Sequence, residues 1–215
     1  MVHWLLGFIR VLGFGYWSLI SMDGLKMNKP FYYNLVISGF GGQGVLIIGN
    51  LLADAAMREG RRVTFLPIYG VEMRGGTANC TVVVSSQEIG SPVIERPHGA
   101  IIMNLPSLVK YQPRILPGGL MLFNSSLIEA KEANRQDIKL LPIPVNDIAI
   151  ENGNPRLANM VALGAFIAKT KVVQMTSLFA SLEKVIDERY HTLIPSNIEA
   201  IEKGAHFVKT LNQPS

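Results

Sequence analysis

A glycine-rich loop between two apolar segments is the feature that most constrains this chain. The loop occupies residues 38–45 and follows an apolar run at residues 33–37, which is typical of a buried strand. Apolar side chains then recur at helical spacing over residues 45–57. A strand, a glycine loop and a helix in this order open a βαβ unit, so the sequence predicts an α/β fold.

The spacing of the loop glycines indicates an anion-binding turn. Gly39, Gly41 and Gly44 match the pattern G-x-G-x-x-G, and Gly42 and Gln43 complete the loop. Glycines permit a tight turn and let main-chain N–H groups and the positive end of the helix approach an anion. We therefore expect a phosphate or carboxylate site here. A purely structural turn that packs the helix on the strand is the alternative.

The rest of the chain continues the alternation of strands and helices. We expect a three-layer α/β/α fold with a mostly parallel, mixed sheet and a Rossmann-like loop after the first strand. Two prolines in the last strand favour a position at the edge of the sheet. Strands are expected at residues 62–66, 77–85, 99–104, 119–124 and 139–144, and helices at 105–111, 155–168, 176–188 and, behind a Ser-x-x-Glu capping box, 196–210.

A second polar segment follows the second strand. It spans residues 69–76 and combines Tyr69, an acid at Glu72, a base at Arg74 and the glycines Gly75 and Gly76. The guanidinium of Arg74 offers a planar fork to a phosphate or carboxylate. This composition favours a ligand-binding turn, and a surface turn with a solvated ion pair is the alternative.

Asparagines supply the third group of candidate residues. Asn104 follows a buried strand, at the end where α/β folds bind their ligands. Asn154 is suited to cap a helix whose first residue is Pro155. Arg156 and Asn159 are three residues apart, so we expect both to face one side of the first helical turn, as a cap brace or as part of a site.

Composition narrows the possible functions. The chain is 48% hydrophobic, which suggests surface covered by partner subunits. A net charge of +4, without clustered basic and aromatic residues, argues against nucleic acid. The single cysteine, Cys80, excludes an internal disulfide and a cysteine-held cluster within this chain, and suggests the reducing cytoplasm. We interpret it as a buried small apolar residue, and the isolated His191 and His206 as surface or packing residues.

Residues 1–26 do not continue this pattern. Residues 4–20 are mostly apolar, but Arg10 interrupts them and three glycines weaken a helix. No basic lead and no small-residue cleavage site identifies a signal peptide, and a membrane span would be short and charged. The alternatives are an over-extended reading frame or a non-native lead ahead of Met27, a partner-binding or interfacial helix, and a membrane anchor. We expect residues 1–26 to lie outside the fold, residues 27–215 to form one domain, and membrane association to be absent.

Taken together, the three polar segments resemble the gamma subunit of the 2-oxoacid:ferredoxin oxidoreductases. The glycine loop, the E-x-R-G-G of residues 72–76 and the N-M-V of residues 159–161 carry the resemblance, which covers about residues 31–208. It implies an enzyme complex that decarboxylates a 2-oxoacid on thiamine diphosphate with magnesium. Electrons then pass through iron–sulfur clusters to ferredoxin, and the acyl group passes to coenzyme A.

The resemblance also implies a division of labour. This sequence has no G-D-G…N-N motif and no C-x-x-C-x-x-C motif, which agrees with cofactors held by alpha, beta and possibly ferredoxin-like delta subunits. The chain alone would hold none, and its loop and Arg74 would meet the phosphates of coenzyme A. Residues 73–80 look more like the 2-oxoglutarate and branched-chain types than the pyruvate type.

Two other functions stay open. One is a ligand-free structural subunit of the same complex. The other is a free-standing Rossmann-type dehydrogenase, which would need an acidic ribose ligand near the end of the second strand, where the sequence is Leu-Pro-Ile-Tyr.

Overall fold

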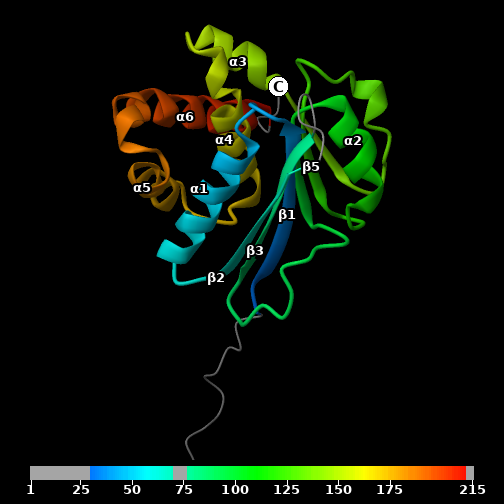
Figure 1. The fold of residues 1–215 in the computed structure, drawn as a ribbon. Coiled ribbons are helices and arrows are strands. Elements are labelled where there is room, and N and C mark those ends of the chain that lie inside the picture. Colours follow the sequence, from blue (N-terminus) through cyan, green and yellow to red (C-terminus); the bar gives the residue numbers. More distant parts are fainter. Residues whose placement is uncertain (1–29, 70–76, 212–215) are drawn as a thin grey trace, which may run out of the picture.

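A six-stranded sheet forms the centre of the part of the chain that the structure describes, residues 30–69 and 77–211 (Figure 1). The structure is a computed structural model. The strand order is β2-β3-β1-β4-β5-β6. The strands are β1 (Tyr32–Phe40), β2 (Arg62–Tyr69), β3 (Thr77–Ser85), β4 (Gly99–Ile102), β5 (Leu120–Asn124) and β6 (Lys139–Ile143).

The sheet is mixed and mostly parallel, as predicted. Strands β1, β4, β5 and β6 pair in parallel, whereas β3 is antiparallel to both β1 and β2. Only β3 therefore runs in the opposite direction within the described sheet. The proline-containing strands β2 and β6 lie at the two edges, where an N–H group is not needed on the open side.

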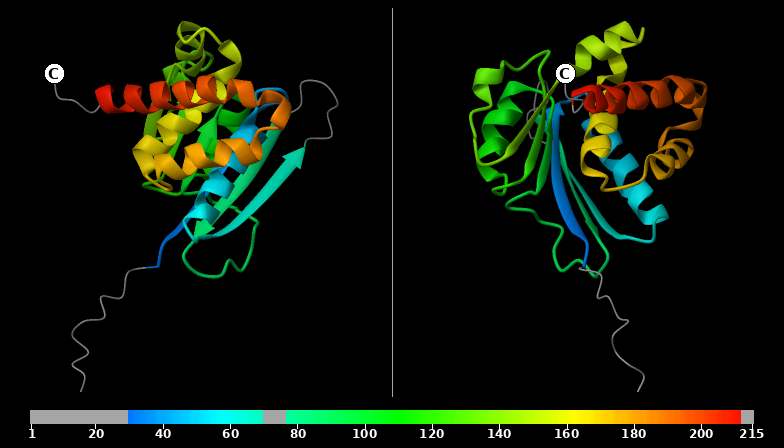
Figure 2. Two further views of the ribbon diagram at one scale, coloured as in Figure 1. Left: turned by 90° about the vertical axis from the view of Figure 1, so that its left-hand side faces the viewer. Right: turned by 180° about the vertical axis from the view of Figure 1, so that it is seen from behind.

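Helices cover both faces of the sheet (Figures 1 and 2). Helices α1, α4, α5 and α6 pack on one face, and α2 packs on the other. The short α3 stands beyond the carboxyl edge of the sheet. The helices are α1 (Val45–Arg58), α2 (Leu105–Tyr111), α3 (Val145–Glu151), α4 (Ala158–Thr170), α5 (Met175–Val185) and α6 (Ile194–Leu211).

Alternation along β1 divides the core into two layers. Leu35 and Ile37 face the large helical layer, while Val36 faces the α2 layer. In the large layer α4 and α6 cross closely through two glycines. A Cβ atom on Gly164 would overlap the carbonyl of Ile201, so only glycine lets the backbones approach this closely.

The helix predictions near the carboxyl terminus were partly wrong. Helix α3 was not predicted, since its seven residues carry no side-chain cap. The capping box at Ser196 is not used, because a 3₁₀ turn at Glu188–Leu193 leads directly into α6 at Ile194. Asn197 lies inside that helix, where its Nδ2 donates to the carbonyl of Leu193 at 2.7 Å.

Several sequence-based predictions fall outside the described residues. They concern residues 1–26 and, in the second polar segment, Glu72, Arg74, Gly75 and Gly76. Among the helices that the structure describes, none has the length and apolar character needed to cross a membrane.

Candidate functional site

The glycine loop lies at the carboxyl edge of the sheet, between β1 and α1. From neighbouring strands the chain leaves in opposite directions, because β1 leads to α1 on one face and β4 leads to α2 on the other. In α/β folds such a reversal opens a crevice outside the carboxyl ends of the strands, where ligands bind. The loop therefore occupies the position expected of a binding site.

The backbone of the loop needs its glycines. Gly42 and Gly44 have φ angles of 91° and 69°, in the left-handed region that glycine adopts at little cost. The N–H of Gln43 donates to the carbonyl of Phe40 at 3.1 Å and closes the turn. The Gln43 Oε1 accepts from the N–H of Phe40 at 2.7 Å. A Cβ atom on Gly39 would lie 2.6 Å from that Oε1 and 2.9 Å from the Cβ of Met103, so a larger residue there would displace Gln43 and crowd the end of β4.

The amino terminus of α1 is open behind this loop. Gly44 is the N-cap, no side chain of the described residues caps it, and the first turn holds no acidic residue. Gly41 and Gly42 are exposed. The first N–H groups of a helix have no partner within the helix, and the macrodipole adds a partial positive charge there. The arrangement is therefore suited to a phosphate or carboxylate.

Asn159 fixes the loop from a distant part of the chain. Its side chain is 5% exposed, and its Nδ2 donates to the carbonyl of Gly44 at 3.2 Å. Its Oδ1 accepts from the N–H of Met160 at 3.0 Å. A Cβ atom on Gly44 would overlap this amide. The third polar segment thus meets the first, and Asn159 braces the glycine loop.

The residues before Asn159 lie differently from the prediction. Asn154 caps a 3₁₀ turn at Pro155–Leu157 through its Oδ1, which accepts from the N–H of Arg156 at 3.1 Å. Arg156 is exposed whereas Asn159 is buried. Arg156 lies in the 3₁₀ turn and Asn159 in α4, so the two do not share one α-helical turn, contrary to the prediction.

Asn104 lies beside the loop, at the end of β4. Its Oδ1 accepts from the N–H of Ser107 at 2.9 Å and caps α2. The Nδ2 of this side chain, which is 2% exposed, has no partner in the part of the chain that the structure describes. Sequence reasoning missed the neighbouring pair of hydroxyls, in which Ser38 Oγ donates to Ser107 Oγ at 2.9 Å. Ser107 stands three residues after Asn104, which is the spacing of an asparagine cap and was the available signal.

Asn124 also ends a buried strand, but it has a structural role. Its Nδ2 donates to Asn146 Oδ1 at 2.8 Å and thereby connects β5 to α3. The second polar segment is described only at its start, where the backbone of Tyr69 ends β2 opposite Ala78.

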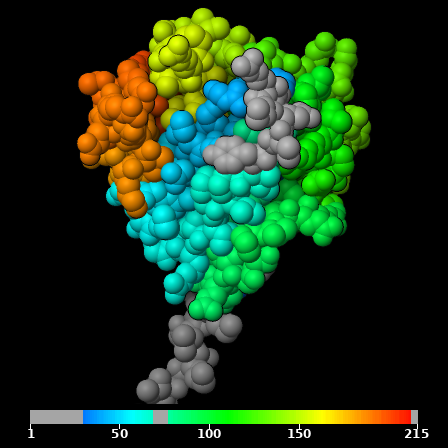
Figure 3. Space-filling model, in the orientation of Figure 1, coloured from blue at the N-terminus to red at the C-terminus, as the bar shows by residue number. Residues whose placement is uncertain are grey.

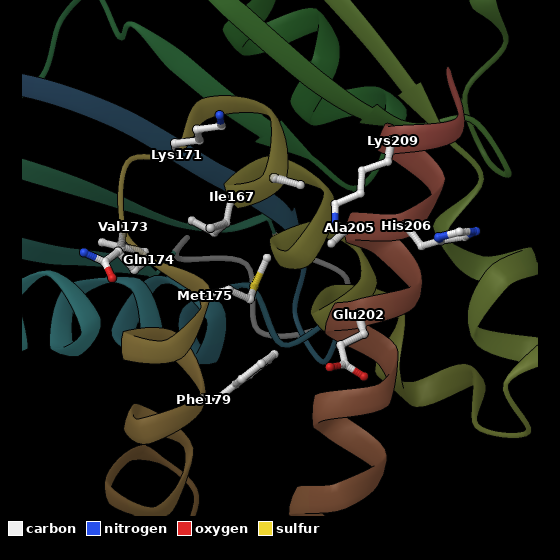
Figure 4. Close-up of a pocket in the computed structure, with 11 residues that line it drawn as sticks. Ile167, Lys171, Val173, Gln174, Met175, Phe179, Glu202, Ala205, His206 and Lys209 are labelled. Carbon is white, nitrogen blue, oxygen red and sulfur yellow. The ribbon is translucent and has the colours of Figure 1, made fainter. Parts of the chain in front are cut away.

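Other features of the described chain lie apart from the loop. A hollow of about 590 Å³ between α4, α5 and α6 is lined mainly by apolar side chains, with Met175 and Phe179 pointing into it (Figure 4). His206 borders this hollow. Cys80 is fully buried, as predicted, and burial raises the pKa of its thiol to about 12. Among the described residues, no three His, Cys, Asp or Glu side chains are grouped to hold a metal ion.

Sequence comparison relates the chain to oxoacid oxidoreductases. Residues 34–207 match the family described as pyruvate ferredoxin/flavodoxin oxidoreductase. The ketoisovalerate oxidoreductase subunit VorA of Methanothermobacter thermautotrophicus is 34% identical over 80% of this chain and 36% of its own length. The 2-oxoglutarate synthase subunit KorC of Methanocaldococcus jannaschii is 30% identical over 87% of this chain and 97% of its own length. The chain thus spans about a third of VorA but nearly all of KorC.

Solved structures agree with this relationship. The gamma subunit of a keto/oxoacid ferredoxin oxidoreductase from Geobacter sulfurreducens superimposes with a TM-score of 0.70 at 25% identity, over 83% of this chain and 99% of that one. A 2-oxoglutarate:ferredoxin oxidoreductase from Magnetococcus marinus, with 2-oxoglutarate, coenzyme A and succinyl-CoA bound, shares the fold with a TM-score of 0.77 at 23% identity, over 86% of this chain and 32% of that one. The chain therefore belongs to the pyruvate ferredoxin/flavodoxin oxidoreductase family, and it has the fold of a gamma-type subunit.

Proposed function

We propose that this chain serves in a multi-subunit 2-oxoacid:ferredoxin oxidoreductase and that its glycine loop binds an anionic group of coenzyme A. The observation that carries the proposal is the open amino terminus of α1, which lies behind exposed glycines at the carboxyl edge of the sheet. A phosphate accepts hydrogen bonds from main-chain N–H groups at such a terminus and interacts favourably with the helix dipole.

The chain contributes binding and positioning rather than acid–base chemistry. The N–H groups that stay free at the start of α1 donate to phosphate oxygens, and Asn159 Nδ2 donates to the carbonyl of Gly44, which keeps that carbonyl turned away from the anion. In the assembled enzyme, thiamine diphosphate supplies the site of decarboxylation and iron–sulfur clusters carry the electrons. We assign those groups to partner subunits, because this chain has a single cysteine and no diphosphate–magnesium motif.

Arg74 and Glu72 complete the proposed binding site. The guanidinium of Arg74 offers a bidentate contact to a second phosphate, and Glu72 orients that guanidinium or contacts a partner subunit. These two roles rest on the sequence alone, since both residues lie outside the described part of the chain.

The substrate we propose is 2-oxoglutarate. Support comes from the KorC proteins, 2-oxoglutarate synthase subunits that this chain matches over nearly their full length. Relatives named for ketoisovalerate and indolepyruvate make those two oxoacids the next to test, together with pyruvate. Alpha and beta subunits, possibly a ferredoxin-like delta subunit, and ferredoxin are the proposed partners, and the cytoplasm is the proposed location.

A ligand-free structural subunit of the same complex is the second candidate. One observation favours it: contacts within the chain already account for three of the loop glycines, since Gly39 accommodates Gln43, Gly44 accommodates Asn159, and Gly42 needs only its positive φ. The two candidates differ in whether the loop contacts coenzyme A in the assembled enzyme.

Reconstitution with partner subunits separates these functions. The assay is coenzyme A-dependent reduction of methyl viologen by each 2-oxoacid, with the Arg74→Ala variant compared with Arg62→Ala, a control change at an exposed arginine that begins β2. We expect turnover only in the complex, and a KM for coenzyme A raised about tenfold by Arg74→Ala alone, the factor that corresponds to about 1.4 kcal/mol. Turnover by the isolated chain would refute the subunit role. An unchanged KM in both variants would favour the structural candidate.

A further inference from the structure

Exposed apolar side chains gather at the carboxyl edge of the sheet, on both sides of the glycine loop. The exposed fractions run from 39% for Phe40 to 59% for Ile150. We call this set the apolar rim. Its members are Phe40, Ile47, Ile68, Leu105, Leu127 and Ile150.

The sheet brings the members of the rim into one row. Phe40 is the last residue of β1 and Ile68 the last but one of β2, and Leu105 and Leu127 follow the ends of β4 and β5. Ile150 lies on α3. This helix is connected to the loop after β5, because Ser126 Oγ donates to Asp147 Oδ2 at 3.0 Å. The strands from β2 to β5 are separated by four spacings of about 4.8 Å, so this part of the rim is about 19 Å wide. That width suits a standard protein interface, which covers about 800 Å² on each partner.

These elements meet on one face of the molecule. Figure 3 shows the blue residues at the end of β1 and the start of α1 between the yellow-green α3 and the green residues on the α2 side. Exposed apolar side chains that gather on one face of a domain are typical of an interaction site.

We propose that the apolar rim is the docking surface for a larger polypeptide, the counterpart of the segment that VorA-type relatives carry in the same chain. This chain spans 97% of KorC and 99% of the Geobacter gamma subunit, but only 36% of VorA and 32% of the Magnetococcus chain. The same domain therefore occurs both as a separate polypeptide and as one third of a longer one. In the longer chains the remaining segment is joined covalently to this domain, and for KorC-type chains we assign the same role to a second polypeptide that is seated on the rim.

The location of the rim indicates why this face is the one covered. The glycine loop lies in the middle of the row, so a partner seated on the rim also closes over the loop. Removal of water from the loop strengthens the interaction of its N–H groups with an anion, since electrostatic interactions are stronger at low dielectric constant. The inference thus rests on the proposed function and adds the surface through which the assembly forms.

Two pairs of variants test the rim. Ile47→Glu and Met57→Glu change the first and last turns of the same helix, α1, at side chains 47% and 51% exposed. An acidic residue in a first helical turn favours the helix, so Ile47→Glu should fold normally. Leu127→Glu tests the rim away from the loop, and Leu140→Glu, on the edge strand β6, is its control. The circular dichroism and thermal unfolding of each purified variant establish that it is folded.

The measurement is the Kd between each variant and the larger polypeptide, made without coenzyme A. We expect Ile47→Glu and Leu127→Glu to raise the Kd at least about 30-fold, because an apolar contact is replaced by a desolvated carboxylate, and the controls to stay within about threefold. Wild-type affinity in both rim variants, or equal weakening by the controls, would refute the proposal that the rim is the docking surface. If this chain forms a homodimer that Ile47→Glu disrupts, the rim binds a second copy of this chain and the proposed larger partner is wrong. Failure of the wild-type chain to bind any such polypeptide would instead refute the proposed function.

Discussion

Truncation of Asn159 tests the connection between the buried brace and the glycine loop. In Asn159→Ala the N–H of Met160 loses its acceptor, and the carbonyl of Gly44 keeps only the N–H of Ile48, at 3.3 Å. A buried donor without a partner costs about 1–3 kcal/mol, so we expect a loss of about 2 kcal/mol in the free energy of unfolding. The loop also loses the contact that orients Gly44.

Asn197→Ala is the matched control. This side chain is also 5% exposed and also donates its Nδ2 to a backbone carbonyl, that of Leu193, but it lies within α6. Its truncation should lower the unfolding free energy by a similar amount, about 1–2 kcal/mol, without a change at the loop.

Two assays separate stability from binding. Urea denaturation of the purified chain gives the unfolding free energy, and coenzyme A titration of the assembled enzyme gives the KM. We expect Asn159→Ala to raise the KM for coenzyme A about tenfold, equivalent to about 1.4 kcal/mol, and Asn197→Ala to leave it unchanged. Equal KM values in the two variants, at equal loss of stability, would refute the view that Asn159 organises a binding loop.

Three further predictions concern stability and pH. Gly164→Ala should destabilise the chain by about 3 kcal/mol in urea denaturation, because its methyl group overlaps the Ile201 carbonyl; Gly90→Ala, with nothing within 4 Å, should have little effect. Burial lowers the pKa of His98, so the unfolded state takes up the proton first and stability should fall as pH drops below about 6.5; a midpoint above 6.5 in an NMR titration would contradict this. Burial alone would raise the pKa of Asp54, but hydrogen bonds from Lys184, Arg58 and Ser181 outweigh it and lower the pKa. Stability should therefore be lost as pH falls below about 3.8. Lys184→Met should cost about 0.5–1 kcal/mol at pH 7, because the lost ion pair with Asp54 is screened by solvent on the lysine side; a denaturation midpoint equal to that of the wild type would contradict this.

Local patterns were sufficient to predict much of this fold. The strand at β1, the glycine loop and α1 follow from apolar periodicity and glycine spacing within a few residues of one another. The edge position of β6 follows from its prolines. Patterns of this kind act through neighbouring residues, so a single sequence contains them in full.

Contacts between distant segments were not predictable in the same way. The bond between Asn159 and Gly44 joins residues 115 positions apart, and it depends on how α4 packs beside α1. Asn104 and Asn124 look equivalent in the sequence because both follow strands, yet only Asn124 finds an amide partner in Asn146. Tertiary packing decides these pairings, and local sequence carries little information about it.

A structure of the assembled enzyme with coenzyme A bound tests the central claim most directly. We expect phosphate oxygens of coenzyme A to lie about 3 Å from the main-chain nitrogens at the start of α1, the distance of a charge-assisted hydrogen bond. Coenzyme A held elsewhere, with those N–H groups facing solvent or a partner side chain, would contradict it.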